Sequence, residues 1–529
     1  MRLPRRSHNT RRHWGDPRMS SNIKKRPALA ANSLFSVGAW LFPILLGFIS
    51  TPTLVRNLGS EQYGLFAVVL GFVSYSFSFG IGKVAGKFVP EFQSLGEERK
   101  SVEAVSATFI VTLAIGALGA VILIVAASFV VRDVLLIDAE HQQAVTYCLY
   151  IAAIVGLSAM LSQVFQYVLQ GLHRFDNYVA LMNLYALLLG TGNIILAYNG
   201  FGIVTLLLWN LTVSVFTASL FYLRARRLFP PLTLFTKVPR DLFKAVAGYA
   251  GNIILFQVFA NALYIFERTW VMRKFGPEEL TFYFVPMILA TYMHGFVASI
   301  IQATFPVVNE MLGDRERVAA LYRRANKIVL AIVVFSVTTF VTCGALFLKL
   351  WVSAELSEGS EKLLVLHGLT FSVIAMGILA LQTAEAYRFP VLNVIMTGCW
   401  MLLGIPMMIF AADIWAAEGV AGARFVAALI VSIPVITFSE HRFLGGVQWR
   451  FWCAVGVRIA IAIAVTVLVQ EFALSYLGQS YAGLLVAGIV GGLIFLGTLL
   501  LAGFVTEDDK EMLRWAFMRR SPAVAETTE

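Results

Sequence analysis

Long apolar runs separated by short polar turns fill this chain from residue 28 to residue 504. A membrane-spanning helix needs about 20 consecutive apolar residues, and fourteen runs approach or exceed that length. We therefore expect an all-α polytopic membrane protein with about fourteen transmembrane helices. The predicted spans are 28–55, 62–86, 104–131, 144–170, 177–198, 202–223, 244–267, 280–305, 327–350, 363–384, 389–411, 418–438, 452–471 and 480–504.

The composition agrees with this interpretation. Hydrophobic residues make up 58% of the 529 residues and charged residues only 14%, whereas about a quarter of the residues in a soluble domain are charged. This deficit of charge excludes secreted, fibrous, disordered and cytosolic classes. No interval between the spans is long enough to form a soluble enzyme domain.

The basic residues lie mostly on one side of the predicted membrane. If the N-terminus is cytoplasmic, 33 of the 41 Lys and Arg residues fall inside, seven fall outside and Arg424 falls within a span. Cytoplasmic loops carry an excess of Lys and Arg. The distribution predicts that both termini are cytoplasmic, and it accounts for the net charge of +10 without a nucleic-acid partner.

An internal repeat divides the chain. The segment TLVRNLGSEQYG begins at Thr53, and the related segment WVMRKFGPEELT begins 217 positions later at Trp270. At this offset Arg56 aligns with Arg273 and Gly59 with Gly276, and the turn Arg174–Phe175 aligns with 388–389 at an offset of 214. Both copies start on the same side of the membrane. We expect two pseudo-symmetric six-helix bundles with the substrate path between them, a recurrent transporter architecture.

The domain organisation follows from these spans and the repeat. It comprises a basic cytoplasmic tail, an N-terminal six-helix bundle, a cytoplasmic linker with a possible interfacial helix, a C-terminal six-helix bundle, two additional transmembrane helices and a second cytoplasmic tail. The corresponding ranges are 1–27, 28–223, 224–243, 244–438, 452–504 and 505–529.

Several basic residues fall within or beside the spans, where charge is costly and usually functional or paired. Lys83 and Lys87 are four positions apart near the end of the second span; they are either a cationic wall of the path or anchors at the inner interface. A second set lies at the outer ends of the first and seventh spans and forms either an anion-attracting vestibule or a set of helix-end charges and ion pairs. That set is Arg56, Arg268, Arg273 and Lys274.

Three further ionisable groups fall in or beside the later spans. Glu267, next to Arg268, is either a structural partner of that arginine or a carboxylate that couples transport to protons or sodium. His294 is either a hydrogen-bonded interior residue or a proton site. Arg424 has no carboxylate at helical spacing within its span and is a further candidate to face the cavity.

The cysteines give no sign of a metal centre. Cys148, Cys343, Cys399 and Cys453 are far apart in apolar segments, so we interpret them as small buried hydrophobic residues. We expect no metal, no cofactor and no catalytic residues.

Three segments carry a family resemblance: the turn LVRNLGSEQYG at Leu54–Gly64, the turn QGLHRF at Gln170–Phe175, and NALYIFERTWVMRKFGPEELTFYF from Asn261. Through these segments the chain resembles, over nearly its whole length, the polysaccharide-biosynthesis flippases of the MOP (multidrug/oligosaccharidyl-lipid/polysaccharide) superfamily, which also contains the lipid II flippases and the MATE drug antiporters. Where this chain has Glu267, the family often has an aspartate.

The resemblance implies a MOP/MATE-like fold with a central cation-lined cavity and transport by alternating access. It implies that the substrate is an undecaprenyl-diphosphate-linked oligosaccharide, moved from the cytoplasmic to the outer leaflet of the bacterial inner (plasma) membrane for O-antigen, exopolysaccharide or capsule biosynthesis. The expected partners are this substrate, membrane lipids, and a polysaccharide polymerase and glycosyltransferases. Fixed Lys and Arg residues would neutralise the diphosphate.

Two other functions remain open at this stage. One is a MATE-like cation-coupled multidrug exporter, which would favour carboxylates in the cavity. The other is a membrane polysaccharide polymerase or ligase, although the outer loops here are short for such an enzyme. The sequence does not specify the glycan, the coupling ion, the oligomeric state, or whether translation starts at Met1 or Met19.

Overall fold

The structure of the protein is a computed structural model that describes residues 26–77, 79–302, 308–309 and 311–506. Within these ranges the regular secondary structure is helical. The predicted terminal tails lie almost entirely outside them. The helices are α1 (Arg26–Ser76), α2 (Lys83–Ser94), α3 (Glu98–Phe129) with the π-helical turn η2 (Val130–Val134), α4 (Ala139–Gly171), α5 (Phe175–Tyr198), α6 (Ile203–Leu228), α7 (Arg240–Gln302), α9 (Arg315–Trp351), α10 (Ala354–Ala386), α11 (Val391–Phe443), α12 (Trp449–Leu477) and α13 (Tyr481–Leu501).

Three long helices reverse at sharp kinks. The kink in α1 is at Gly59 (φ 82°), and the kink in α7 is at Gly276 (φ 87°). A positive φ is readily adopted only by glycine, so the repeated glycine marks the same turn in both halves. In α11 the kink is at Trp415 and Ala416. Each kink falls between two predicted spans, but a total of fourteen crossings stays a prediction.

Corresponding helices of the two halves begin at positions that the sequence repeat aligns. Helix α3 begins at Glu98 and α9 at Arg315, which is the 217-residue offset of the sequence repeat. The short turns after α4 and α10 place His173 and Arg388 at positive φ. These two residues are 215 positions apart, so the turns align one position away from the sequence alignment. The rotation that relates the two halves stays a prediction.

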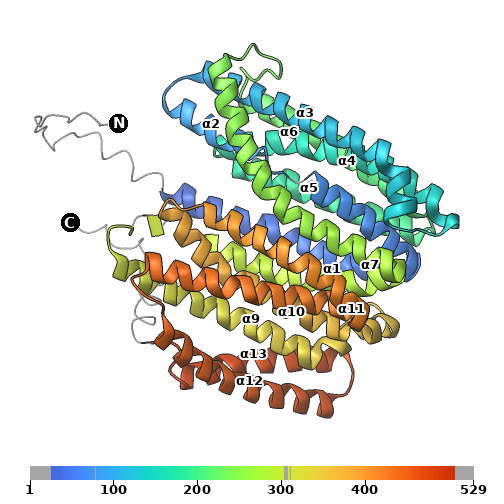
Figure 1. Cartoon of the computed structure of the whole chain (residues 1–529), viewed down its shortest axis with the longest axis vertical. Coiled ribbons are helices and arrows are strands. Elements are labelled where there is room, and N and C mark those ends of the chain that lie inside the picture. Colours follow the sequence, from blue (N-terminus) through green and yellow to red (C-terminus); the bar gives the residue numbers. More distant parts are fainter. Residues whose placement is uncertain (1–25, 78, 303–307, 310, 507–529) are drawn as a thin grey trace, which may run out of the picture.

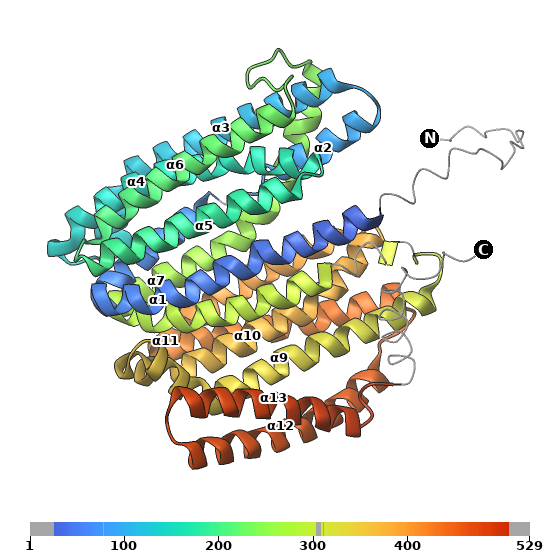
Figure 2. The same cartoon turned by 180° about the vertical axis from the view of Figure 1, so that it is seen from behind.

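Figure 1 shows α3, α4 and α6 grouped in the upper part of the molecule and α9, α10 and α11 below them. Helix α7 runs from the upper group to the lower one and packs against α1, α10 and α11. The view from behind shows α5 beside α1 (Figure 2), and these helices are in contact. Helices α12 and α13 pack against each other and α9 at the lower edge.

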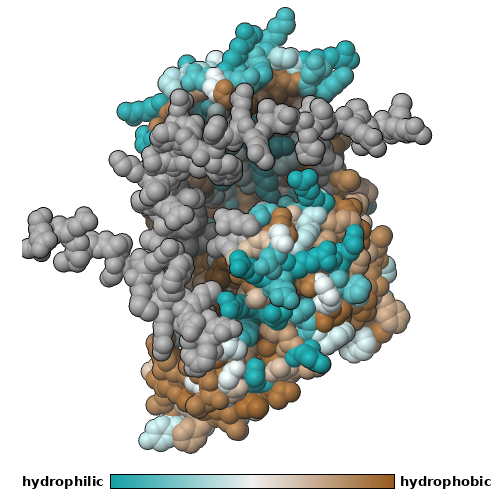
Figure 3. All heavy atoms as spheres, turned by 90° about the vertical axis from the view of Figure 1, so that its left-hand side faces the viewer, coloured by the Kyte–Doolittle hydropathy of each residue, from teal (hydrophilic) through white to brown (hydrophobic). Residues whose placement is uncertain are grey.

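Ten of the described helices are long and apolar enough to cross a membrane. On α13, Leu485 and Leu493 are each 65% exposed, and such a surface is stable only in an apolar surrounding. Figure 3 shows apolar side chains over the lower flank and hydrophilic ones across the upper and middle parts of the left-hand end. These features, with the membrane transporters of similar fold reported below, identify a multi-pass membrane protein.

Side-chain caps define several helix starts. The Asp314 carboxylate accepts hydrogen bonds from the backbone N–H groups of Glu316 and Arg317 at the start of α9, each 3.1 Å long. The Ser353 hydroxyl caps α10 in the same way, through Leu356 N–H. Such caps satisfy N–H groups that have no partner within the helix.

Two expectations about the spans need correction. The second span was expected to continue to residue 86, but α1 ends at Ser76 and a separate helix, α2, begins at Lys83. The seventh span was expected to end at residue 267, but α7 stays helical up to Gly276. Arg268 is therefore about two turns, or about 12 Å, inside that helix rather than at its outer end.

The cysteines are only partly as expected. Cys148 and Cys343 are buried, whereas Cys399 and Cys453 are exposed on helix surfaces. Apolar neighbours in the sequence do not distinguish a residue inside a helix bundle from one that faces the bilayer.

Candidate functional site

A buried ion pair lies in the second half of the protein. Glu267 of α7 is fully buried, and its Oε2 accepts a hydrogen bond from Arg424 of α11. Its Oε1 accepts a second hydrogen bond, from the hydroxyl group of Tyr283. A buried charge requires such partners because burial removes its hydration. The carboxylate of Glu267 is thus neutralised from a distant helix, and its sequence neighbour Arg268 is not the partner.

Aromatic rings and a histidine enclose this pair. The Arg424 guanidinium lies 4.6 Å from the ring centroid of Tyr264 and 5.0 Å from that of Phe371. His367 packs its ring on Tyr283, with centroids 4.6 Å apart, and its Nε2 lies 3.2 Å from the Tyr283 carbonyl oxygen. The pair is therefore shielded from bulk solvent by side chains of α7, α10 and α11.

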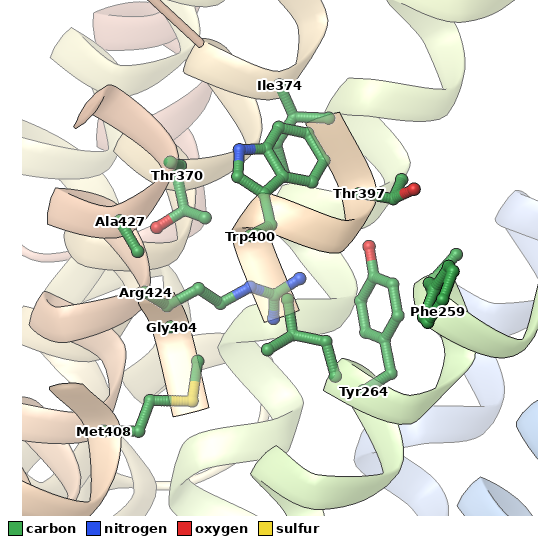
Figure 4. Close-up of a pocket in the computed structure, with 13 residues that line it drawn as sticks. Phe259, Tyr264, Thr370, Ile374, Thr397, Trp400, Gly404, Met408, Arg424 and Ala427 are labelled. Carbon is green, nitrogen blue, oxygen red and sulfur yellow. The ribbon is translucent and has the colours of Figure 1, made fainter. Parts of the chain in front are cut away.

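Arg424 also lines a small cavity of about 120 Å³, which Glu267 and Tyr283 do not line. Figure 4 shows the guanidinium of Arg424 extending toward Tyr264, with Trp400 beside it. The indole Nε1 of Trp400 is buried without a hydrogen-bond partner. The cavity lies among the helices of the second half, between the two legs of α11 and the neighbouring α7 and α10.

Arg268 projects from the same turn of α7 in another direction. Successive helical residues point about 100° apart, which separates Arg268 from the Glu267 pair. Its guanidinium carbon lies 4.1 Å from the ring centroid of Phe284 and 4.8 Å from that of Tyr75. Its Nη2 lies 3.4 Å from the Tyr75 hydroxyl oxygen, and Gly71 leaves room for it.

The charge of Arg268 is not compensated by an acidic side chain. The residue is only 6% exposed, and its Nε is buried without a hydrogen-bond partner. Among the residues that the structure describes, no carboxylate lies within ion-pair distance of it. Stacking on aromatic faces stabilises a desolvated cation by about 2 kcal/mol. Because stacking leaves the N–H groups in the guanidinium plane without an anionic partner, the side chain can bind an anion.

Tyr75 places Arg268 at the boundary between the two halves. The residue lies on the second leg of α1, and its carbonyl oxygen accepts a 2.7 Å hydrogen bond from Asn261 Nδ2 of α7. Its ring stacks on Tyr264, with centroids 4.9 Å apart and an interplanar angle of 2°. A movement that separates α1 from α7 here would uncover Arg268.

Three other predicted site residues lie near the helix kinks at the opposite end from α2. Arg56 donates hydrogen bonds to backbone carbonyls at the end of α9, and Arg273 to those at the end of η2. Lys274 forms an exposed ion pair with Asp413, with Nζ 2.6 Å from Oδ1. Arg56 and Arg273 therefore bind the carbonyl ends of helices, and Lys274 forms an ion pair. None of the three contacts Glu267.

The remaining predicted residues also lie apart from Arg268. Lys83 and Lys87 are exposed on one face of α2, and Lys87 Nζ lies 4.3 Å from the ring centroid of Tyr249. His294 is packed near Phe371, with ring centroids 5.7 Å apart, and its Nδ1 has no hydrogen-bond partner. Of the predicted residues that the structure describes, Glu267 and Arg424 are paired directly, His294 shares the Phe371 ring with Arg424, and Arg268 projects from the same turn of α7 toward Tyr75 and Phe284.

The aromatic and amide residues that contact these charged groups were not predicted as site residues. They are Tyr75, Asn261, Tyr264, Tyr283 and Phe284. Only Asn261 and Tyr264 lie within two helical turns of Glu267 in the sequence, whereas Tyr75 is 193 positions from Arg268 and has no local signal. In the described part of the chain, no group of three or more His, Cys, Asp or Glu side chains is arranged to hold a metal ion.

Comparisons with known proteins agree with this architecture. Residues 53–361 match the family described as "Polysaccharide biosynthesis protein". A relative from Shigella flexneri, "Putative O-antigen transporter", is 21% identical over 372 residues, which cover 66% of this chain and 83% of the relative.

Two solved structures have a similar fold. The lipid II flippase MurJ in an inward closed conformation has a TM-score of 0.69 at 14% identity, covering 89% of this chain and 98% of MurJ. An inward-facing MATE multidrug transporter of the MOP superfamily has a TM-score of 0.63 at 15% identity, covering 78% and 94% of the two chains. The expected all-α, MOP/MATE-like fold is confirmed, and the protein belongs to the polysaccharide biosynthesis protein family.

Proposed function

We propose that this protein flips an undecaprenyl-diphosphate-linked oligosaccharide from the cytoplasmic to the outer leaflet of the bacterial inner membrane. The family match and the relationship to a putative O-antigen transporter support a role in polysaccharide export. In this proposal both termini are cytoplasmic, as the distribution of Lys and Arg predicts. A glycosyltransferase would supply the substrate, and a polysaccharide polymerase would use the flipped product.

The observation that carries the proposal is Arg268. A diphosphate cannot cross hydrocarbon without compensation of its charge, and a guanidinium can bind phosphate oxygens in a bidentate way. Arg268 is a buried cation with no described carboxylate partner, at the boundary between the two halves. The lipid tail would remain in the bilayer while the head group passes between the halves.

The contacts around Arg268 also suggest how binding and movement are linked. In the present conformation the Tyr75 and Phe284 rings flank the guanidinium. A phosphate could replace the weak 3.4 Å contact to the Tyr75 hydroxyl when α1 separates from α7. A ligand shifts a conformational equilibrium only by its difference in affinity for the two states, and a charged partner for Arg268 would supply such a difference.

The electrostatics of the site weigh against the two alternative functions. A cation-coupled drug exporter needs an available carboxylate, but Glu267 is already bonded to Arg424 and Tyr283. The cation of Arg268 would also repel a cationic drug. A polymerase or ligase is disfavoured because the relative named above and the structural neighbours are transporters.

The test is transport by purified protein in lipid vesicles, with a fluorescent undecaprenyl-diphosphate oligosaccharide as the substrate. A hydrogen bond between charged groups contributes about 1.5–3 kcal/mol, so Arg268→Ala should slow flipping by roughly ten- to a hundredfold. Arg268→Lys should restore only part of the rate, because an ammonium group lacks the planar fork. Arg132→Ala, which removes an exposed arginine away from Arg268, is the control.

Each variant is compared at equal reconstituted amounts and with its thermal unfolding measured. Normal flipping by Arg268→Ala would refute the assignment of this residue. The exporter would instead be supported by a different result: the unmodified protein does not flip the diphosphate substrate but transports a cationic dye when an ion gradient drives it.

A further inference from the structure

A second basic site lies outside the boundary between the halves, in a groove between the first turns of α5 and the last turns of α6. The groove has a volume of about 350 Å³. Its walls are aliphatic, and two arginines lie at the end of α6. The lining residues are Asn177, Ala180, Leu181, Leu220, Leu223, Arg224 and Arg227.

One of these arginines is oriented by a chain of hydrogen bonds. Asn177 is only 6% exposed, and its Nδ2 donates a 2.7 Å hydrogen bond to Asp176 Oδ2. Asp176 is in turn paired with Arg174 through two hydrogen bonds of 3.1 and 3.2 Å. Because its amide is fixed in this way, Asn177 presents Oδ1 to the Nε of Arg224.

This arrangement leaves basic groups available in the groove. The Nε of Arg224 donates to Asn177, whereas within the described residues nothing accepts a hydrogen bond from its terminal nitrogens or from the side chain of Arg227. The two residues are three positions apart and therefore share a face of α6. Among the described residues, no carboxylate lies within ion-pair distance of either guanidinium.

The groove therefore combines two kinds of surface. The leucines offer an apolar wall, and Leu223 is 57% exposed in a helix that crosses the membrane. The arginines lie where the helix ends, on the side that the Lys and Arg distribution assigns to the cytoplasm. Figure 1 places the start of α5 and the end of α6 at the left-hand end, with α2.

We propose that this groove binds an anionic membrane phospholipid. The head-group phosphate would bind to Arg224 and Arg227, and an acyl chain would lie along Leu181, Leu220 and Leu223. Anionic lipids of the cytoplasmic leaflet attract basic segments next to the membrane, and a guanidinium fork suits phosphate. A free anion would make no use of the leucine wall. The proposal does not depend on the transported substrate.

The test uses the full-length protein, purified in detergent and titrated with phosphatidylglycerol. Native mass spectrometry measures the bound lipid, and thermal unfolding measures the stabilisation. The double variant Arg224→Gln/Arg227→Gln should bind phosphatidylglycerol at least about tenfold more weakly, because each charged hydrogen bond changes affinity by about that factor. Arg226→Gln is the matched control: Arg226 is in the same turn but does not line the groove.

Two further ligands distinguish the sources of phosphate. Phosphatidylcholine should bind more weakly than phosphatidylglycerol and lose less affinity on the double substitution, because its choline group offsets the phosphate charge. Inorganic phosphate alone should not stabilise the protein. Equal binding by the double variant and the wild type would overturn the proposal, and so would stabilisation by inorganic phosphate to the same extent as by lipid. If the double variant is not monodisperse, the single variant Arg227→Gln is tested in its place, because that side chain is exposed and its loss should not disturb folding.

Discussion

Arg56 and Arg273 occupy equivalent positions in the two halves of the protein, and each binds the end of a helix in the other half. Arg56 Nε donates a 2.7 Å hydrogen bond to the Val352 carbonyl, and its Nη2 approaches the carbonyls of 350 and 351 at 3.1 and 3.0 Å. Arg273 Nη1 approaches the carbonyls of Asp133 and Val134 at 2.5 and 3.0 Å.

This exchange joins the two halves near the kinks of α1 and α7. The last carbonyls of a helix lack partners within the helix and carry partial negative charge, so a guanidinium stabilises them. The same region contains a hydrogen bond from Thr281 Oγ1 to the Ser60 carbonyl, 2.5 Å long. The backbone of Gly64 also lies so close to Pro277 that a Cβ atom would be 1.8 Å from its carbonyl oxygen.

The first prediction is that these arginines favour closure at the end of the molecule that carries the kinks. Replacing both, as Arg56→Ala/Arg273→Ala, should shift the population toward states in which the halves are farther apart there. Spin labels on cysteines introduced at Glu140 and Glu355, which begin α4 and α10, report this distance. We expect a longer or broader distance distribution in the double variant.

The labelled background carries Cys399→Ala and Cys453→Ala, because both native thiols are exposed. Arg132→Ala, an exposed arginine of η2 at the same end, should leave the distribution unchanged. An unchanged distribution in the double variant would show that the reciprocal contacts do not affect closure.

The second prediction concerns the glycines at the kinks. Replacing Gly59 or Gly276 with alanine should lower the free energy of unfolding by about 1–3 kcal/mol, because a positive φ combined with an extended ψ (161° and 179°) is essentially restricted to glycine. An added Cβ meets no atom within 4 Å at either position, so the effect would be one of backbone strain alone.

Gly202→Ala provides the control. Gly202 also has no neighbour within 4 Å of a Cβ, but its φ of −78° suits any residue. Thermal unfolding in one detergent should therefore rank both kink variants below Gly202→Ala. Equal stability of the three variants would contradict the strain argument.

The fold was largely predictable because its signals are local. The kinks at Gly59 and Gly276 were marked by the 217-residue repeat, and apolar length marked most of the helices. The break before Lys83 was not predicted because residues 77–82 continue the apolar run, although Gly80 within them has a φ of 66° that favours glycine. Hydropathy alone does not show where such a helix ends.

The site was predictable only in part, because it depends on contacts between distant segments. Glu267 and Arg268 are adjacent in sequence, yet helical rotation directs them to different partners. The partner of Glu267 is Arg424, 157 positions away. The repeat itself offers one signal: at the 217 offset, Arg268 aligns with Thr51, so this charge belongs to one half only and is not needed to form the repeated fold.

The third prediction is the membrane topology. Reporter fusions after Arg227, after Arg324 and at the C-terminus should indicate the cytoplasm, and a fusion near His141 should indicate the opposite side. The expectation follows from the excess of Lys and Arg on one side of the predicted membrane. A reporter at the C-terminus that indicates the outer side would mean that the number of spans is odd.

The fourth prediction is that Glu267 and Arg424 stabilise the fold as a pair. Removing one member leaves an uncompensated buried charge, so Glu267→Gln or Arg424→Gln should each lower the free energy of unfolding by about 3–5 kcal/mol. The double variant Glu267→Gln/Arg424→Gln should be more stable than either single variant, because no unpaired charge remains. A double-mutant cycle of unfolding measurements gives the coupling between the two residues.

Transport by the same variants separates this structural role from ion coupling. If the pair is structural, the double variant should flip substrate at a rate close to that of the wild type once equal amounts of folded protein are compared. A folded double variant that has lost transport, or whose transport no longer responds to a sodium or proton gradient to which the wild type responds, would make Glu267 a coupling group. The enclosure of Glu267 by Arg424, Tyr283 and the neighbouring rings favours the first outcome.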